Sequence, residues 1–412
     1  MPGIVEFPPV VQDALEHSGD LFAHECQRRH FAESLTGLFV AERKTVLGIN
    51  GEFAQTTDPS GLNRFLTEAP WAVETLNEWR LERLPKDPAT RYSDHGIIPI
   101  DNTLIDREGM LIPDAGWYWD QAEERYKIAQ DSLFLAYVGT SGKHYPLEFR
   151  RFRKEEDCEA LKPPFPNHTA LCCELIDWVC ERDIPGDFTM DGYFTNAEIL
   201  NHIHSKPDRF GRPRGYVGDL KSNRQVEWRG RIIKVNELAA SIPPGDRKEL
   251  GIGDRRQWYF TVSLHIPEVN HKVRIVIRWR YRQDPEPVKI LVTNRVAWEV
   301  SRIVRVYRHR WTGTETFDRD GKQHVGRGDC QLRDPQGQDR HMYLVMLAYS
   351  LLMGQLRQGR AQEWALPRLM TIGEACGAMA KETLRTTLSW AIEQVTRFEQ
   401  PYDRVVAQLG LN

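Results

Sequence analysis

The sequence predicts an α/β protein in which a core of strands and helices is interrupted by a second group of strands, with helical regions at both ends. Three observations predict this class. Apolar residues recur at helical spacing over residues 25–90 and again beyond residue 296. Between them, short apolar or alternating runs are interspersed with amphipathic helices as far as residue 222. Residues 225–295 then return to an extended pattern.

Length and composition indicate several domains and no membrane span. The 412 residues exceed what one hydrophobic core usually organises, so two or three domains are expected. With 41% hydrophobic and 27% charged residues, the chain is neither disordered nor fibrous. No apolar run approaches the roughly 18 to 20 residues of a membrane helix, and no leader pattern opens the chain. Seven cysteines without CxxC spacing argue against a disulfide framework or a zinc knuckle, so we expect a reducing cytoplasm.

Positive charge is concentrated in the middle of the chain. The whole sequence has 55 Lys and Arg against 58 Asp and Glu, a net charge of −3. Residues 205–310 contain 24 Lys and Arg against 11 Asp and Glu, so this segment carries +13 and the rest −16. Trp228, Trp258 and Trp279 lie among these basic residues. Basic residues with interleaved aromatics indicate a surface that faces nucleic acid, although arginines on the outer face of a sheet give the same count.

The N-terminal region, residues 1–92, is predicted to be helical. Apolar residues in the segments HFAESLTGLFVAERK and WAVETLNEWRLERL repeat every three to four positions. Ser60 is placed to cap a helix after the turn at Asp58. Acids outnumber bases over residues 25–90, so DNA binding and dimerisation both stay open as its task.

The first part of the core, residues 93–222, is predicted to contain five strands and two helices. Strands are expected at 96–100, 131–138, 144–152, 187–190 and 216–220, and helices at 168–182 and 196–205. The order of three strands, helix, strand, helix and strand is that of the ribonuclease-H-like fold, whose two carboxylate-bearing strands are neighbours. A weak Pro-rich linker is expected at Lys162 to Pro166.

Residues 223–295 are predicted to form a basic domain of β-strands inserted into this core. The runs QVEWRGRIIKV, QWYFTVSLHI, HKVRIVIRWRYR and VKILVTNR all read as strands. Arg278, Arg280 and Arg282 fall on one face of such a strand and form a candidate basic stripe. The remainder of the core, residues 296–352, and a C-terminal helical region, residues 353–412, follow.

Three acidic residues are the candidate catalytic residues. Asp101 follows the apolar strand 97–100, Asp191 follows the strand 187–190, and Glu315 lies in a dense segment between Tyr307 and Lys322. On a helix, seven residues advance by about 700°, so Lys322 lies on roughly the same face as Glu315. Asp94, Asp106, Asp114, Asp120 and Asp131 compete with Asp101, and Asp183 and Asp187 compete with Asp191; the position at a strand end favours Asp101 and Asp191.

These residues resemble those of the DDE-type transposases of bacterial insertion sequences. The matching branch has a β-strand insertion between the second Asp and the Glu, and a Tyr-x2-Arg-x3-Glu-x6-Lys signature. In this sequence the signature is Tyr307, Arg310, Glu315 and Lys322, with one extra residue between Arg and Glu. The family's Asp-Asp-Thr-Leu is here Asp101-Asn102-Thr103-Leu104, and the resemblance extends over about residues 95–350.

The resemblance implies an enzyme that cuts the ends of a mobile element and joins their 3′-hydroxyl groups to target DNA. It implies two Mg²⁺ ions as cofactors, for which Mn²⁺ is expected to substitute. Asp101 is implied as the bridging ligand, with Asp191 and Glu315 as ligands of one ion each. Two ions roughly 3.5 to 4 Å apart activate the attacking oxygen and stabilise the leaving oxygen in such reactions.

The same resemblance implies the DNA contacts. Tyr307, Arg310 and Lys322 are expected to hold backbone phosphates, as are Lys221 and Arg224 after the second Asp. Trp311 and Trp298 are candidates for stacking on an unpaired base, with core packing as the alternative for either ring. The implied partner is double-stranded DNA, both element ends and target, bound by a dimer in the cytoplasm at the nucleoid, with no membrane contact.

Two other interpretations stay open from the sequence. A nuclease or junction resolvase would keep the fold and stop at hydrolysis. A DNA-binding protein descended from a transposase would use the basic strands to hold DNA without cutting it. Joined products distinguish a transposase from the first alternative, and loss of activity on mutation of the acids distinguishes it from the second.

Overall fold

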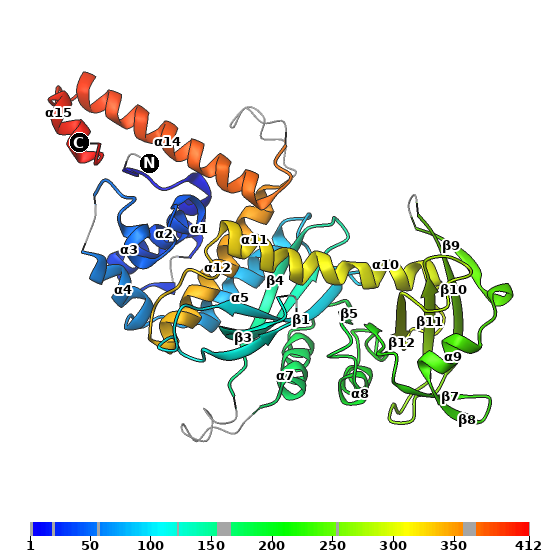
Figure 1. Cartoon of the computed structure of the whole chain (residues 1–412). Helices are drawn as coiled ribbons and strands as arrows, with labels where there is room; N and C mark the ends of the chain where they lie inside the picture. The colour runs from blue at the N-terminus through cyan, green and yellow to red at the C-terminus, as the bar shows by residue number, and fades with distance from the viewer. Residues whose placement is uncertain are drawn as a thin grey trace. The chain divides into compact units, whose positions relative to one another are not determined.

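The computed structural model describes residues 3–18, 21–55, 58–121, 123–154, 166–252, 255–356 and 368–411 (Figure 1). The chain divides into two compact units, the first made of Met1–Arg91, Ile105–Gln130 and Thr316–Asn412, the second of Tyr92–Leu104 and Asp131–Glu315. This division runs across the five predicted segments, whose roles as separate domains stay a prediction. The predicted Pro-rich linker lies, except for Pro166, outside the described residues.

The second unit is built around one mixed sheet. From β4 the strand order is β3, β1, β5, β6, β12, β11, β10 and β9. β5 pairs in parallel with β1 and β6, whereas β12 joins β6 in antiparallel. Four strands of the segment predicted as an insertion, β9 to β12, therefore extend the same sheet, whereas β7 and β8 pair with each other in a separate hairpin. The bounds of the strands in this sheet are β1 Ile97–Asp106, β3 Arg125–Val138, β4 His144–Arg151, β5 Asp187–Met190, β6 Tyr216–Asp219, β9 Lys248–Ile252, β10 Arg255–Leu264, β11 Val273–Trp279 and β12 Lys289–Thr293.

β1 is longer than predicted. The sequence places its end at Asp101, but the strand continues to Asp106. On one side β5 pairs only with Ile97–Ile100 and ends at Met190. On the other side β1 has β3 as its neighbour, which allows it to continue. Asp101 therefore lies where pairing with β5 stops, inside β1 and not at its end.

The two predicted helices of this unit are confirmed. α7 spans His168–Glu181 and α8 spans Ala197–Ser205. Each begins at an asparagine whose side-chain oxygen accepts a backbone N–H of the first turn, at 2.9 Å for Asn167 and 3.0 Å for Asn196. A short helix that was not predicted, α9 (Val235–Ser241), follows the hairpin of β7 (Gln225–Trp228) and β8 (Arg231–Lys234).

α10, Val300–Arg310, lies on the sheet of the second unit and is drawn in yellow in Figure 1. It contacts β5, β6, β12 and β9. Its buried side chains pack in one core cluster with Val217, Val276 and Leu291 from the strands below. The helix leads into a π-helical segment, Trp311–Glu315. The sheet and this segment together position the candidate site.

The first unit is mainly helical, and the predicted helical ends of the chain are confirmed. The prediction that Ser60 caps α4 is wrong. The cap is Asp58, whose carboxylate accepts the Ser60 N–H at 2.9 Å. No helix in the described part of the chain is long and apolar enough to cross a membrane. The bounds are α1 Pro9–His17, α2 Glu25–Val40, α3 Val46–Asn50, α4 Pro59–Thr67, α5 Val73–Arg83, β2 Gly116–Asp120, α11 Thr316–His324, α12 Pro335–Gln355, α14 Ile372–Thr396 and α15 Tyr402–Gln408.

Candidate active site

Asp101 and Asp191 occupy neighbouring positions on adjacent strands. Ile100 of β1 pairs with Met190 of β5, so the next residue on each strand is one of the two aspartates. Adjacent strands lie roughly 4.8 Å apart. The Asp191 carboxylate accepts the backbone N–H groups of Tyr193 at 2.9 Å and Phe194 at 3.1 Å. This turn holds the Asp191 side chain at the carboxyl end of β5.

Arg310 links Asp101 to Glu315. Its Nη1 donates to Asp101 Oδ2 at 2.5 Å and its Nη2 to Glu315 Oε1 at 3.0 Å. The side chains of Arg310 and Asp101 are 9% and 16% exposed, whereas that of Glu315 is 38% exposed. The three acids predicted from the sequence thus come from three separate segments of the second unit and converge on one region.

The π-helical segment brings the side chains of Arg310 and Glu315 together. The two residues are five positions apart, and a π-helix bonds residues at that spacing where an α-helix bonds those four apart. The extra residue relative to the family signature stays a prediction. Gly313 lets this segment approach the sheet, because a Cβ there would lie 2.5 Å from Pro99 Cγ of β1 and 3.3 Å from Ala136 Cβ of β3.

Negative charge accumulates at Asp101. Burial is the main cause that raises the pKa of Asp101 to about 7; Asp191 and Glu315 add to the rise, and Arg310 opposes it. Nearby, burial raises the pKa of the Tyr307 hydroxyl to about 12, so this group is protonated at neutral pH. The site therefore needs positive charge in order to keep its carboxylates ionised.

Carboxylate oxygens are the ligands that hard divalent cations prefer, so the side chains of Asp101, Asp191 and Glu315 are chemically suited to bind such an ion. Over the described ranges, though, no group of three His, Cys, Asp or Glu side chains lies in position to hold a metal ion. The Arg310 guanidinium lies between Asp101 and Glu315 and supplies the positive charge there. In this arrangement a metal and Arg310 would compete for the same oxygens.

Residues 92–351 match a family described as transposase DDE domain. The chain belongs to this family. Membership confirms the resemblance to DDE-type transposases and supports a transposase-type function, with DNA as the substrate. Members of this group generally use divalent metal ions. No curated protein matches the sequence.

The predicted DNA-contacting aromatic residues of the transposase lie in different surroundings. Tyr307 is buried in the core cluster beneath α10. The Trp311 side chain is 55% exposed, beside the Arg310 guanidinium at 4.7 Å from its ring. Trp298 packs against the core cluster, and the Arg302 guanidinium covers its ring at 3.9 Å. Trp311 thus has the exposed ring that base stacking needs, whereas the contacts of Trp298 favour core packing.

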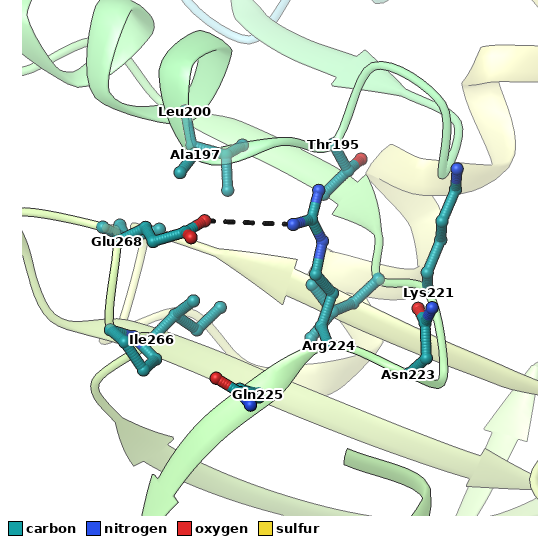
Figure 2. A pocket seen from close by; sticks show the side chains of 12 residues that line it. Thr195, Ala197, Leu200, Lys221, Asn223, Arg224, Gln225, Ile266 and Glu268 are labelled. Atoms are coloured by element: carbon teal, nitrogen blue, oxygen red, sulfur yellow. Dashed lines mark ion pairs between the residues drawn. The ribbon is translucent and has the colours of Figure 1, made fainter. Parts of the chain in front are cut away.

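Lys221 and Arg224 line a pocket of about 390 Å³ next to the Asp191 loop (Figure 2). The Arg224 side chain extends across it toward Glu268, with 4.0 Å between Nη1 and Oε2. The Lys221 ammonium lies 5.7 Å from the ring of Tyr193, two residues beyond Asp191. Lys322 belongs to α11 of the first unit, where it pairs with Asp318 at 3.3 Å, and its role stays a prediction.

The predicted basic stripe on β11 is wrong for Arg278. This side chain is only 9% exposed and donates to Gln257 of the neighbouring strand, while β11 ends at Trp279, before Arg280 and Arg282. The alternation of the sequence suggested an outer face, but this side chain is buried near α10, whose Tyr307 and Arg308 act electrostatically on its guanidinium. Two arginines of α10, Arg305 and Arg308, are exposed and form a row of positive charge that was not predicted from the sequence. Their spacing of three on a helix was the available signal.

Several of the competing acids have basic partners elsewhere. Asp187 pairs with Arg295 at 2.8 Å, Asp131 with His168 at 2.7 Å, and Asp94 with Arg209. Asp106 and Asp120 both pair with Lys127. Asp114 and Asp183 have φ values of 59° and 49°, typical of tight turns. The choice of Asp101 and Asp191 over these acids stays a prediction.

Proposed function

We propose that this transposase cleaves phosphodiester bonds at the ends of a bacterial insertion sequence and transfers the freed 3′-hydroxyl groups to target DNA. The observation that carries the proposal is the meeting of three acids from distant segments. Asp101 and Asp191 follow paired residues of parallel strands, and Arg310 bonds both Asp101 and Glu315. Such a carboxylate group suits phosphodiester chemistry because it would bind the divalent cations that compensate the charge on the phosphate.

We infer a ribonuclease-H-like core from the strand order. The sequence β4, β3, β1, β5, β6 in space, with α7 between β4 and β5 and α8 between β5 and β6, supports this assignment. In this interpretation β7 to β12 and α9 form the insertion, which precedes the Glu-bearing helical segment. Asp101 and Asp191 then lie on the two central strands.

We assign Asp101, Asp191 and Glu315 as the residues that would hold two Mg²⁺ ions, replaceable by Mn²⁺. When bound, the ions activate the attacking oxygen and stabilise the leaving oxygen. The chain's own groups hold the DNA around them. Arg310 exchanges its carboxylate partner for a backbone phosphate.

The remaining DNA contacts follow from exposure and charge. Lys221 and Arg224 bind phosphates at the mouth of the pocket beside Asp191, and Lys322 is assigned to a phosphate on its position in the signature. The exposed ring of Trp311 stacks on an unpaired base, and Trp298 is the weaker candidate. The Tyr307 hydroxyl, which is protonated at neutral pH, donates a hydrogen bond to a backbone phosphate.

We further propose that the active form is a dimer on DNA, with a second copy on the outer face of α14. Leu384, Leu388, Ile392 and Val395 are 37%, 53%, 63% and 39% exposed. At roughly 100° per residue they fall within an arc of about 80°, and the opposite face of the helix is buried as far as Thr387. Lys381 precedes this stripe and Glu399 follows it. In two antiparallel copies the exposed apolar residues of one α14 would therefore pack against those of the other. Each Lys381 would then lie opposite Glu399 of the other copy.

A strand-transfer assay tests the proposed chemistry. The full-length protein is incubated with Mg²⁺, a pre-cut DNA end taken from the flank of its coding frame, and a supercoiled target. Products joined through the 3′-hydroxyl support the transposase, and nicked or linear DNA alone supports a nuclease or resolvase. Asp101→Asn is expected to abolish cleavage and to leave end binding within a few-fold. Unchanged activity in Asp101→Ala and Glu315→Ala would favour the DNA-binding alternative.

A further inference from the structure

A buried His–Asp pair lies beside the two aspartates and takes no part in the functions assigned above. The Asp131 side chain on β3 is 5% exposed, and its Oδ2 lies 2.7 Å from His168 Nε2. His168 is the first residue of α7, and its ring stacks on that of Phe152 with centroids 3.9 Å apart. Both partners are thus fixed in place.

One arm of this pair reaches Asp101. Asn102, the next residue on β1, donates from Nδ2 to Asp131 Oδ1 at 3.2 Å. The two oxygens of Asp131 are therefore shared between Asn102 and His168. An aspartate at position 102 would bring a second carboxylate to within hydrogen-bond distance of a buried one, which is strongly unfavourable. The amide at position 102 matches the carboxylate that it faces.

The other arm reaches Asp191. The His168 ring meets the Tyr193 ring edge to face, with centroids 5.6 Å apart and planes at 87°. The Tyr193 N–H in turn donates to Asp191 Oδ1 at 2.9 Å. The residue after His168, Thr169, accepts from Asn196 Nδ2 at 3.2 Å through its hydroxyl. The start of α7 therefore contacts the loop of residues 191–196 at two points.

We propose that Asp131 and His168 are positioning residues that set the spacing of Asp101 and Asp191, acting through Asn102 and Tyr193. The inference rests on the proposed function, in which these two aspartates share metal ions. Neither Asp131 nor His168 has to touch DNA or metal for this role. Groups that orient metal-binding side chains from behind typically change activity or metal affinity by about 10- to 100-fold when removed.

The first test replaces His168 and compares it with a matched pair elsewhere. His202 of α8 and Asp177 of α7 form the same kind of contact, at 2.8 Å, nine residues beyond His168 on α7. We expect His168→Ala to lower kcat for cleavage about 10- to 100-fold and to raise the Mg²⁺ concentration for half-maximal rate, with KM for DNA unchanged. His168→Gln, whose amide can donate to Asp131, is expected to recover part of the rate. A His168→Ala enzyme with the kinetics of His202→Ala overturns the proposal.

The second test exchanges the charges of the contact between Asn102 and Asp131. Asn102→Asp sets two carboxylates against each other and is expected to lower kcat at least tenfold. Adding Asp131→Asn restores one amide and one carboxylate in exchanged places, so the double variant is expected to regain most of the rate. Losses that simply multiply in the double variant contradict a direct contact between positions 102 and 131 as the cause.

A third measurement separates this inference from the proposed chemistry. Hydrogen exchange of the Tyr193 and Phe194 amides reports how firmly the Asp191 turn is held, and it requires no cleavage. We expect His168→Ala to speed this exchange at least tenfold, and His202→Ala to leave it as in the wild type. Unchanged exchange in His168→Ala overturns the positioning role, whereas a wild-type protein that never cuts DNA overturns the proposed function alone.

Discussion

At the scale of single residues, the candidate site depends on Arg310. Its guanidinium is the positive partner of both Asp101 and Glu315, and its side chain is 9% exposed. Removing one member of a buried ion pair leaves an uncompensated charge and costs roughly 3 to 5 kcal/mol. The same carboxylates become available to a divalent cation once the guanidinium is gone.

We therefore predict that Arg310→Gln lowers the melting temperature in EDTA. We also predict that Mg²⁺ raises the melting temperature of the variant by more than it raises that of the wild type. A ligand that binds only the folded state stabilises it by a free energy that grows with the logarithm of its affinity. Differential scanning fluorimetry with and without Mg²⁺ measures both effects. Arg305→Gln, on the exposed face of the same helix, is the control. Equal Mg²⁺ effects in both variants would contradict a shared cation site.

A second residue, His271, predicts a pH dependence of stability. Its ring stacks on that of His204 at 3.7 Å between centroids and accepts from the Tyr216 hydroxyl at 2.8 Å. Burial, with smaller effects of His204 and His265, lowers the pKa of His271 to about 4. The unfolded chain binds this proton near pH 6.5, so the stability present above pH 6.5 is lost as the pH falls toward 4.

The loss is expected to approach roughly 3 kcal/mol at pH 4, at about 1.4 kcal/mol per pKa unit. Urea unfolding at pH 7 and pH 5 measures the slope. His271→Gln should flatten it, whereas His17→Gln, at a side chain that is 58% exposed, should not. The same slope in the His271 variant would assign the acid sensitivity to other groups.

At the scale of elements, the π-helical segment determines where Glu315 lies. Gly313 packs against β1, and a Cβ there would come within 2.5 Å of Pro99. Overpacking a dense site costs about 1 to 3 kcal/mol and displaces the backbone. The segment carries Glu315 two residues later.

We predict that Gly313→Ala lowers the cleavage rate at least tenfold and destabilises the protein by about 1 to 3 kcal/mol. Cleavage assays and urea unfolding measure the two effects. At Gly377 of α14 a Cβ would meet no atom within 4 Å outside its own helix turn, so Gly377→Ala is the matched control and should be neutral or slightly stabilising. Full activity in Gly313→Ala would mean that the position of Glu315 does not depend on this contact.

The elements that the sequence predicts well are those set by local periodicity. α7, α8 and β5 are found within a residue or two of their expected bounds because caps and alternation define them. The extent of β1, the burial of Arg278 and the pairing of Asp131 with His168 depend on which strand or helix lies alongside. These partners are far away in the chain, so local pattern gives no signal for them. The three acids were predicted because each lies at a recognisable place in the order of elements, and their roles stay a prediction.

At the scale of the whole molecule, α14 offers a surface on which two copies would meet. A row of exposed apolar side chains is rarely left bare in a soluble monomer. We predict that Leu388→Glu with Ile392→Glu prevents two protein copies from assembling on paired DNA ends, as measured by light scattering of the complex. Leu47→Glu, at a side chain that is 70% exposed on α3, is the control.

The orientation of the copies is tested by charge exchange. Lys381→Glu is expected to weaken the complex several-fold, and adding Glu399→Lys is expected to restore it, because antiparallel copies pair these positions with each other. A parallel arrangement would place each residue against itself and would show no rescue. Assembly that resists the Leu388 and Ile392 changes would place the contact between copies elsewhere.

The ladder between β12 and β6 has a consequence for attempts to dissect the protein. Leu291, Val292 and Thr293 pair with Asp219, Gly218 and Val217. A truncation that removed the basic strands would remove this neighbour of β6. The exposed edge strand would then have unpaired peptide groups, which promote aggregation. The basic strands are therefore no detachable module: a minimal catalytic fragment has to retain β12 or replace it with another strand.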